Sequence, residues 1–188
     1  MALHSISKLY TFDEFEAFIA RPENIARHFE LIHGDIVEKA MPTEEHGIII
    51  HTLSGEIYIF LKANPIARAE IEVRYKMPND DHNGRQPDLS VMVDTKTPII
   101  RKGAVPRMPD LAVEVKSPDD KFKEMREKAD YYLANGTRIV WLIYPHERLV
   151  EVFCPNVDSE ILNESHMLNG EDVLPGFMLA ISELFRLI

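Results

Sequence analysis

The chain has 188 residues, enough for one well-packed domain and few for two, so we expect a single domain over residues 1–188. No apolar run approaches the roughly 18 residues that a membrane span needs, and the N-terminus lacks a signal-peptide pattern. A net charge of -10 argues against nonspecific coating of nucleic acid, and the single Cys154 excludes an intramolecular disulfide and any multi-cysteine zinc site. We therefore expect a cytoplasmic globular protein that does not associate with membranes.

The first 42 residues predict a short helix followed by a hairpin. Thr11 and Glu14 have the spacing of a capping box, and Phe12, Phe15 and Phe18 follow at helical intervals. Two strand-like runs then flank His33 and Gly34, which is typical of a hairpin.

Residues 43–65 predict a long helix. Thr43 is a suitable N-cap, two acidic residues follow it, and Asn64 and Pro65 end the apolar periodicity. At 100° per residue, His46 lies near the middle of the apolar face and Glu56 toward its edge.

The rest of the chain predicts strands around one more helix. Ser117 is a candidate N-cap for that helix, with Pro118 at its first position, a stripe of apolar residues that includes Phe122, and an end at Asn135 and Gly136. Strands are predicted at residues 69–77, 87–94, 109–116, 137–145 and 148–154, and a closing turn with a short helix at 174–185. The predicted class is α/β (α+β), a mixed central sheet flanked by helices with an N-terminal helix and hairpin.

The strand at 109–116 carries two opposite charges. Side chains alternate along a strand, so Glu114 and Lys116 point to the same side, roughly 7 Å apart along the backbone. Asp88 opens the preceding strand and can converge with Glu114 if the two strands are neighbours. One or two carboxylates completed by water and a phosphate oxygen suit Mg²⁺, and Lys116 could orient the attacking water or neutralise the transition state. The pattern predicts a site that cleaves phosphodiesters.

These motifs resemble those of a known superfamily. Pro87 and Asp88, followed after 25 intervening residues by the run "EVK" from Glu114 to Lys116, resemble the PD-(D/E)XK nucleases of restriction-endonuclease-like fold. More narrowly, the chain resembles the Uma-type family of bacterial proteins described as putative restriction endonucleases. The segments that carry this likeness are "ELIHGDIVE", Pro42 and His46, "QPDLSV", "PDLAVEVKSP", Lys128, Tyr131 and Tyr132, Asn135 and Gly136, and "VWLIYP".

The resemblance implies a nuclease core at about residues 43–145 that hydrolyses DNA, with Asp88 and Glu114 as Mg²⁺ ligands, Mn²⁺ as a substitute, and Lys116 as the catalytic lysine. A homodimer follows by analogy, because two strands need two cuts. One departure is Tyr144, which stands where relatives typically have Asp before the proline.

Other charged residues are candidates for supporting roles, each with a simpler explanation. His46 on an apolar helix face is more often a core histidine, Glu45 suits the first turn of its helix, and Glu56 is explained by solvent exposure. Asp110 also follows a proline but shares a strand with Glu114, and Lys128 can pair with Glu124 on its helix. Glu30 is a possible outer ligand.

Residues 96–148 carry eleven Lys and Arg against eight Asp and Glu, unlike the acidic flanks, although solvated helix faces would give the same count. Arg101, Lys102 and Arg107 in this segment are candidate phosphate contacts. Two rival hypotheses remain: a catalytically silent nuclease-fold protein that binds nucleic acid or a protein partner, and a structural protein whose charged strand is merely solvated.

Overall fold

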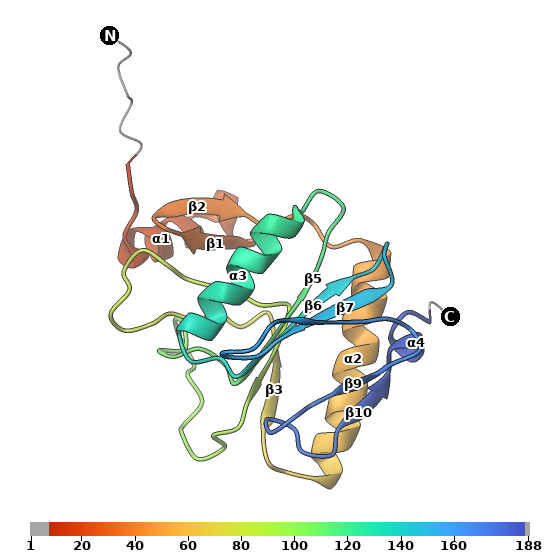
Figure 1. The fold of residues 1–188 in the computed structure, drawn as a ribbon. Helices are drawn as coiled ribbons and strands as arrows, with labels where there is room; N and C mark the ends of the chain where they lie inside the picture. Colours follow the sequence, from red (N-terminus) through yellow and green to blue (C-terminus); the bar gives the residue numbers. More distant parts are fainter. Residues whose placement is uncertain (1–7, 187–188) are drawn as a thin grey trace.

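A six-stranded mixed sheet with a helix against each face forms the centre of the molecule (Figure 1). The computed structural model describes residues 8–186. The sheet order is β3-β4-β5-β6-β7-β8, and β5 and β6 are its one parallel pair in the described chain, joined through α3. The elements are α1 (Phe12–Ile19), a 3₁₀ turn (Pro22–Asn24), β1 (Phe29–Ile32), β2 (Asp35–Glu38), α2 (Glu44–Ala63), β3 (Arg68–Ile71), β4 (Leu89–Met92), β5 (Leu111–Val115), α3 (Phe122–Ala134), β6 (Ile139–Tyr144), β7 (Leu149–Phe153), β8 (Glu160–Leu162), β9 (Met167–Asn169), β10 (Met178–Ala180) and α4 (Ile181–Leu184).

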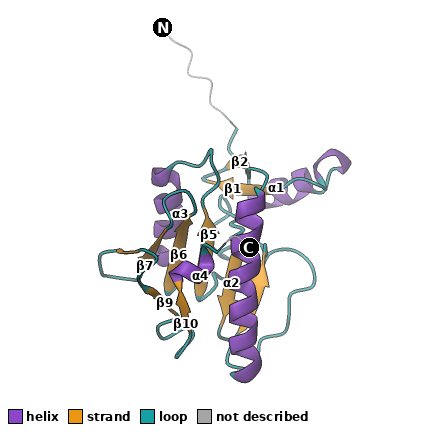
Figure 2. Cartoon of the chain, turned by 90° about the vertical axis from the view of Figure 1, so that its right-hand side faces the viewer, coloured by secondary structure: helices purple, strands orange, loops and turns teal. Residues whose placement is uncertain are grey.

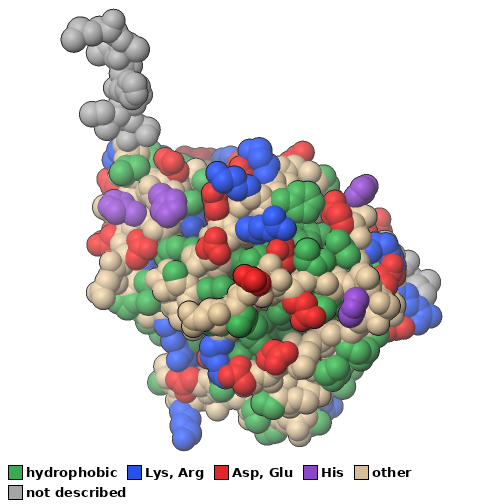
Figure 3. All heavy atoms as spheres, viewed as in Figure 1, with side chains coloured by type: hydrophobic (Ala, Val, Ile, Leu, Met, Phe, Trp, Pro, Cys, Tyr) green, Lys and Arg blue, Asp and Glu red, His purple; other side chains and the backbone are tan. Residues whose placement is uncertain are grey.

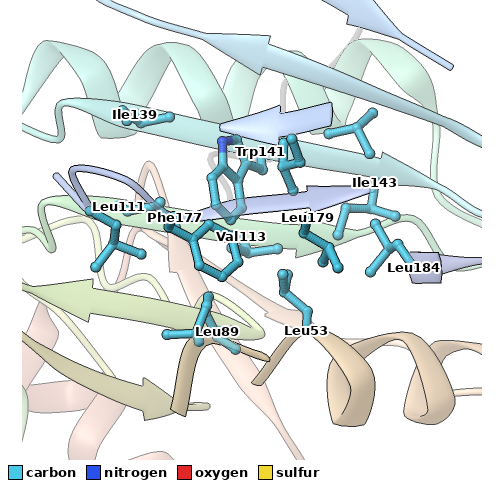
Figure 4. Close-up of a cluster of buried hydrophobic side chains, with 14 of the residues drawn as sticks. Leu53, Leu89, Leu111, Val113, Ile139, Trp141, Ile143, Phe177, Leu179 and Leu184 are labelled. Atoms are coloured by element: carbon cyan, nitrogen blue, oxygen red, sulfur yellow. The ribbon is translucent and has the colours of Figure 1, made fainter. Parts of the chain in front are cut away.

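The two faces of the sheet are buried by different elements, as the side view shows (Figure 2). On one face, α2, α4 and the β9–β10 pair cover the odd-numbered residues of β5, and Trp141 lies in that cluster beside Phe177 (Figure 4). On the other face, α3 packs Met125, Ala129 and Tyr132 over Ala112. Because β5 is buried on both sides, Glu114 lies in the interior and needs partners there.

The predicted N-terminal elements are confirmed. The Glu14 amide donates to Thr11 Oγ1 and the Thr11 amide to Glu14 Oε2, which completes the capping box of α1. Strands β1 and β2 pair across a two-residue loop in which His33 and Gly34 both have positive φ, of 50° and 85°. That backbone suits a tight hairpin turn.

The long helix is also confirmed, while the strand after it is shorter than predicted. Thr43 Oγ1 accepts from the His46 amide, and α2 ends before Asn64. Strand β3 stops at Ile71 because Glu72 has a φ of 53°, which breaks the extended backbone.

The predicted start of α3 is wrong. Ser117 does not cap the helix, which begins at Phe122 with Lys121 as its N-cap. Residues 117–120 instead form a turn. The Asp120 amide donates to the Ser117 carbonyl, and the Ser117 amide donates to Asp120 Oδ2 at 2.7 Å. The apolar stripe is otherwise as predicted, except that Phe122 is largely exposed.

The C-terminal part of the chain contains three strands that were not predicted, β8, β9 and β10. Strand β10 pairs with β9 before the short helix α4 begins. Over residues 8–186, no helix has the length and apolar character needed to cross a bilayer.

Gly84 joins the hairpin to the rest of the molecule and should not tolerate a side chain. Its amide and carbonyl pair with Leu31 of β1, and a Cβ at this position would lie 2.6 Å from a Phe12 ring atom. We expect Gly84→Ala to lower the free energy of unfolding by about 1–3 kcal/mol through overpacking.

Urea denaturation of Gly84→Ala and Gly55→Ala checks this. Gly55 lies within α2, where an added Cβ meets nothing within 4 Å, so its substitution should raise stability by about 0.5–1 kcal/mol. Equal stability changes in the two variants would contradict the close contact with Phe12.

Candidate active site

A cavity of about 560 Å³ lies where the hairpin, the start of α2 and the start of α3 meet the sheet. Asp88 and Glu114 line it, and they are 4% and 2% exposed. Strands β4 and β5 are antiparallel neighbours with Leu89 opposite Val113, so the start of one strand lies beside the end of the other. The tertiary structure therefore brings together the two carboxylates that the sequence separates by 26 positions.

Asp88 accepts hydrogen bonds from two separate parts of the chain. Its Oδ1 accepts from Lys39 Nζ at 2.8 Å, and its Oδ2 accepts from the Val115 amide at 2.8 Å. His46 Nε2 lies 3.6 Å from Oδ2. These contacts fix the carboxylate in one orientation toward the cavity.

The Glu114 carboxylate interacts with one neutral hydrogen-bond donor and one cation. Its Oε1 accepts from the Tyr132 hydroxyl at 2.8 Å, and its Oε2 lies 3.2 Å from Lys128 Nζ. Burial raises the pKa of Glu114 above its usual value, and this outweighs the opposing effect of Lys128; the nearby Asp88 charge raises the pKa further.

Glu30 of β1 is the third carboxylate in the cavity. Its Oε2 lies 2.9 Å from Lys128 Nζ, and its Oε1 accepts from the Gln86 amide. Burial alone would raise the pKa of Glu30, but the charges of Lys128, Lys39 and Arg85 together hold it well below the usual value. Lys128 thus bridges Glu30 and Glu114, rather than pairing with Glu124, which contacts Lys121.

Lys116 does not line the cavity. Its ammonium donates to the Ser117 carbonyl at 3.2 Å and lies 5.3 Å from the centre of the Phe122 ring. The strand ends at Val115, one residue earlier, so strand alternation no longer fixes the direction of this side chain. Sequence spacing placed Lys116 beside Glu114, but the structure places Lys128 there.

The remaining candidates divide into one near the site and several away from it. His46 lines the cavity, and its Nδ1 is buried without a hydrogen-bond partner in the described chain. Glu45 is half-buried and Glu56 is exposed, and neither lines the cavity. Asp110 lies at the opposite end of β5, where its Oδ2 accepts from the Val93 amide.

The candidate phosphate contacts also lie outside the cavity. Arg101 and Lys102 are exposed, whereas Arg107 pairs with Asp94 and lines a second cavity of about 750 Å³ beside β3. Neither Arg101 nor Lys102 lines either of these two cavities.

Sequence reasoning missed two cationic residues of the site. Lys39 follows β2 and reaches Asp88, and Arg85 is buried with its guanidinium 4.5 Å from the centre of the Tyr131 ring. Both line the cavity. Neither belongs to a recognisable motif, and the contact between Lys39 and Asp88 spans 49 positions, so local pattern offered no signal.

The donor set fits a hard divalent cation. Asp88 and Glu114 offer carboxylate oxygens from adjacent strands, and Mg²⁺ often uses one or two such groups together with water. Within residues 8–186, no group of three or more His, Cys, Asp or Glu forms a complete metal cage. Any ion would therefore draw its remaining ligands from water or substrate.

Comparisons with known proteins identify a family and a similar solved structure. A family model described as "Putative restriction endonuclease" matches residues 12–182. The chain belongs to the Uma2 family. A crystal structure of a putative nuclease of the DUF820 group from Anabaena variabilis ATCC 29413 is similar, with a TM-score of 0.79 and 28% sequence identity over 93% of this chain and 97% of that one. No curated protein matches the chain.

The restriction-endonuclease-like mixed fold expected from the sequence is thus confirmed, and membership of the Uma2 family identifies the chain as a putative nuclease. Tyr144, the residue that the sequence resemblance marked as a departure, lies in a buried hydrogen-bonded network. Its hydroxyl donates to the buried Glu151, which also accepts from Arg126 and Ser159.

The bridge formed by Lys128 should be essential for stability. Lys128→Met would leave Glu30 and Glu114 buried without their shared cation, which we expect to cost about 3–5 kcal/mol of unfolding free energy at neutral pH. Lys123→Met on the same helix removes only an exposed pair with Glu127 and should change stability by less than about 0.5 kcal/mol. Chemical denaturation of both variants measures the difference, and similar losses would contradict the role of the bridge.

Proposed function

We propose that this protein is a Mg²⁺-dependent endonuclease that hydrolyses DNA phosphodiester bonds, with Asp88 and Glu114 as the metal ligands. The observation that carries the proposal is the pair of buried carboxylates facing one cavity from adjacent strands, in a member of the Uma2 family. Mn²⁺ should substitute, because it accepts the same oxygen ligands.

The side chains of this site would have distinct roles. Lys39 and the Val115 amide orient Asp88, while Tyr132 and Lys128 orient Glu114. When bound, the metal would stabilise negative charge at the phosphate and lower the pKa of a coordinated water. The cavity holds these groups away from bulk solvent, which strengthens their electrostatic effect on a bound phosphate.

DNA as the substrate is supported by the description of the family. On the face shown in Figure 3, basic and acidic side chains are interspersed rather than gathered into one basic patch. Binding would therefore depend on the cation as well as on surface charge, and Arg101 and Lys102 are the exposed basic residues that we propose as backbone contacts.

A catalytically silent protein is the second candidate, and one observation favours it. The carboxylates are already paired with Lys39 and Lys128, so the network is nearly satisfied without a divalent ion. Such a protein would bind a partner through this fold without cleaving it.

Asp88→Asn tests the metal site. Calorimetric titration of Mn²⁺ should show affinity weakened by at least about tenfold, since losing a direct ligand should cost no less than losing an outer-shell contact. Metal-dependent nicking of supercoiled plasmid DNA should fall with it. Circular dichroism on each protein checks the fold.

Asp110→Asn is the matched control, because Asp110 also follows a proline and begins a strand but lies at the other end of β5. Its Mn²⁺ affinity should match the wild type. A folded wild-type protein that binds no Mn²⁺ with or without DNA would overturn the proposed function in favour of the silent protein.

We also propose that the protein acts as a homodimer, since cutting both strands of a duplex needs two sites. Sedimentation velocity should give about twice the monomer mass of 21.6 kDa, and plasmid cleavage should yield linear DNA. A monomer that only nicks the plasmid would contradict this assembly.

A further inference from the structure

Three lysines lie near the two candidate metal ligands, and the structure separates their roles. Lys116 is nearest in sequence to Glu114, but its ammonium is outside the cavity, between the Ser117 carbonyl and the Phe122 ring. Lys39 and Lys128 both line the cavity. A lysine that acts on a substrate must reach the space that the substrate enters, which leaves these two.

Lys128 stabilises the fold by pairing with two buried carboxylates. Its ammonium lies within 3.2 Å of oxygens from both Glu30 and Glu114. Moving it toward a substrate would leave two buried carboxylates without their cation. Its geometry suits a positioning role.

Lys39 contacts one carboxylate, whereas Lys128 contacts two. An ammonium has three donor hydrogens. Two serve the Gln86 carbonyl at 2.9 Å and Asp88 Oδ1 at 2.8 Å, and one of these two acceptors is neutral. The third donor remains for a group in the cavity, directly beside the carboxylate that we propose as a metal ligand.

We infer that Lys39, rather than Lys116, supplies the ammonium that contacts the scissile phosphate in this site. The inference deepens the proposed function and rests on it for the identity of the substrate. Lys39 contacts Asp88 and lines the same cavity, so its ammonium would stabilise negative charge that develops on a phosphate bound there beside a metal held by Asp88.

The inference makes the hairpin part of the active site. Glu30 lies on β1 and Lys39 directly follows β2, so both precede the nuclease core expected at residues 43–145. The Lys39 amide also donates to the His28 carbonyl, which continues the pairing of the two strands beyond Glu38. The hairpin backbone therefore fixes where the ammonium can reach.

The experiment compares Lys39→Gln with Lys116→Gln, which removes a lysine of similar exposure outside the cavity. Calorimetry measures the affinity for Mn²⁺ and then, in saturating Mn²⁺, for thymidine 5′-monophosphate as a phosphate probe. Nicking of supercoiled plasmid DNA gives kcat and KM. Lys39→Arg tests rescue by a conserved charge, and urea denaturation reports the stability of every variant.

For Lys39→Gln we expect nucleotide affinity to fall about 10- to 100-fold, the range for one hydrogen bond to a charged group. The fall in kcat should be at least about 100-fold. Mn²⁺ affinity should change less than nucleotide affinity, Lys116→Gln should match the wild type in all three measurements, and Lys39→Arg should recover most of the nucleotide affinity.

Opposite results overturn the inference. Nucleotide affinity and kcat retained in Lys39→Gln but lost in Lys116→Gln would assign the role to Lys116. If Lys39→Gln does not fold, loss of nucleotide affinity in the folded Lys116→Gln protein would do the same. A wild-type protein that binds Mn²⁺ and nucleotide but does not cut DNA would overturn the proposed function, and the nucleotide affinity of the variants would still test the Lys39 contact. A wild-type protein that binds no nucleotide would overturn the contact between Lys39 and the phosphate.

Discussion

The buried charges at one end of the sheet impose the strongest constraint on this structure. Glu30, Asp88 and Glu114 lie in the interior, where an unpaired carboxylate would be costly, and Lys39 and Lys128 reach them from the hairpin and from α3. Each lysine contacts an element far away in sequence. The network therefore joins the hairpin, α3 and strands β4 and β5 into one site, and the position of each element depends on the others.

The apolar core makes this arrangement possible. Strand β5 is buried on both faces, and its odd-numbered residues pack beneath α2 while Ala112 packs beneath α3. A strand held from both sides has a fixed register, so the antiparallel pairing with β4 reliably places Asp88 beside Val115. The hydrogen bond between them links the packing of the core to the geometry of the carboxylate.

The sequence motif and the cavity share Asp88 and Glu114, but the cavity contains different lysines. The motif suggests Lys116, while the cavity contains Lys39 and Lys128. The reason is geometric: β5 ends at Val115, so strand alternation does not direct Lys116, and its ammonium lies by the Ser117 carbonyl and the Phe122 ring instead. Two of the five charged groups in the network come from the hairpin, so the site extends beyond the segment that carries the motif.

The sequence by itself determined α1, the hairpin and α2, and it singled out Asp88 and Glu114 as candidates, which stay a prediction. Capping at Thr11 and Thr43, the turn at His33 and Gly34, and the apolar periodicities all depend on residues within a few positions, and the mixed sheet followed from their order. The predicted start of α3 was wrong because Ser117 forms a turn with Asp120 instead of capping the helix. Only the tertiary structure decided which lysines contact the two carboxylates. Lys39 lies 49 positions from Asp88, and Lys128 lies 14 positions from Glu114. Long side chains on different elements have no shared periodicity, so their convergence depends on how the hairpin and helix pack on the sheet.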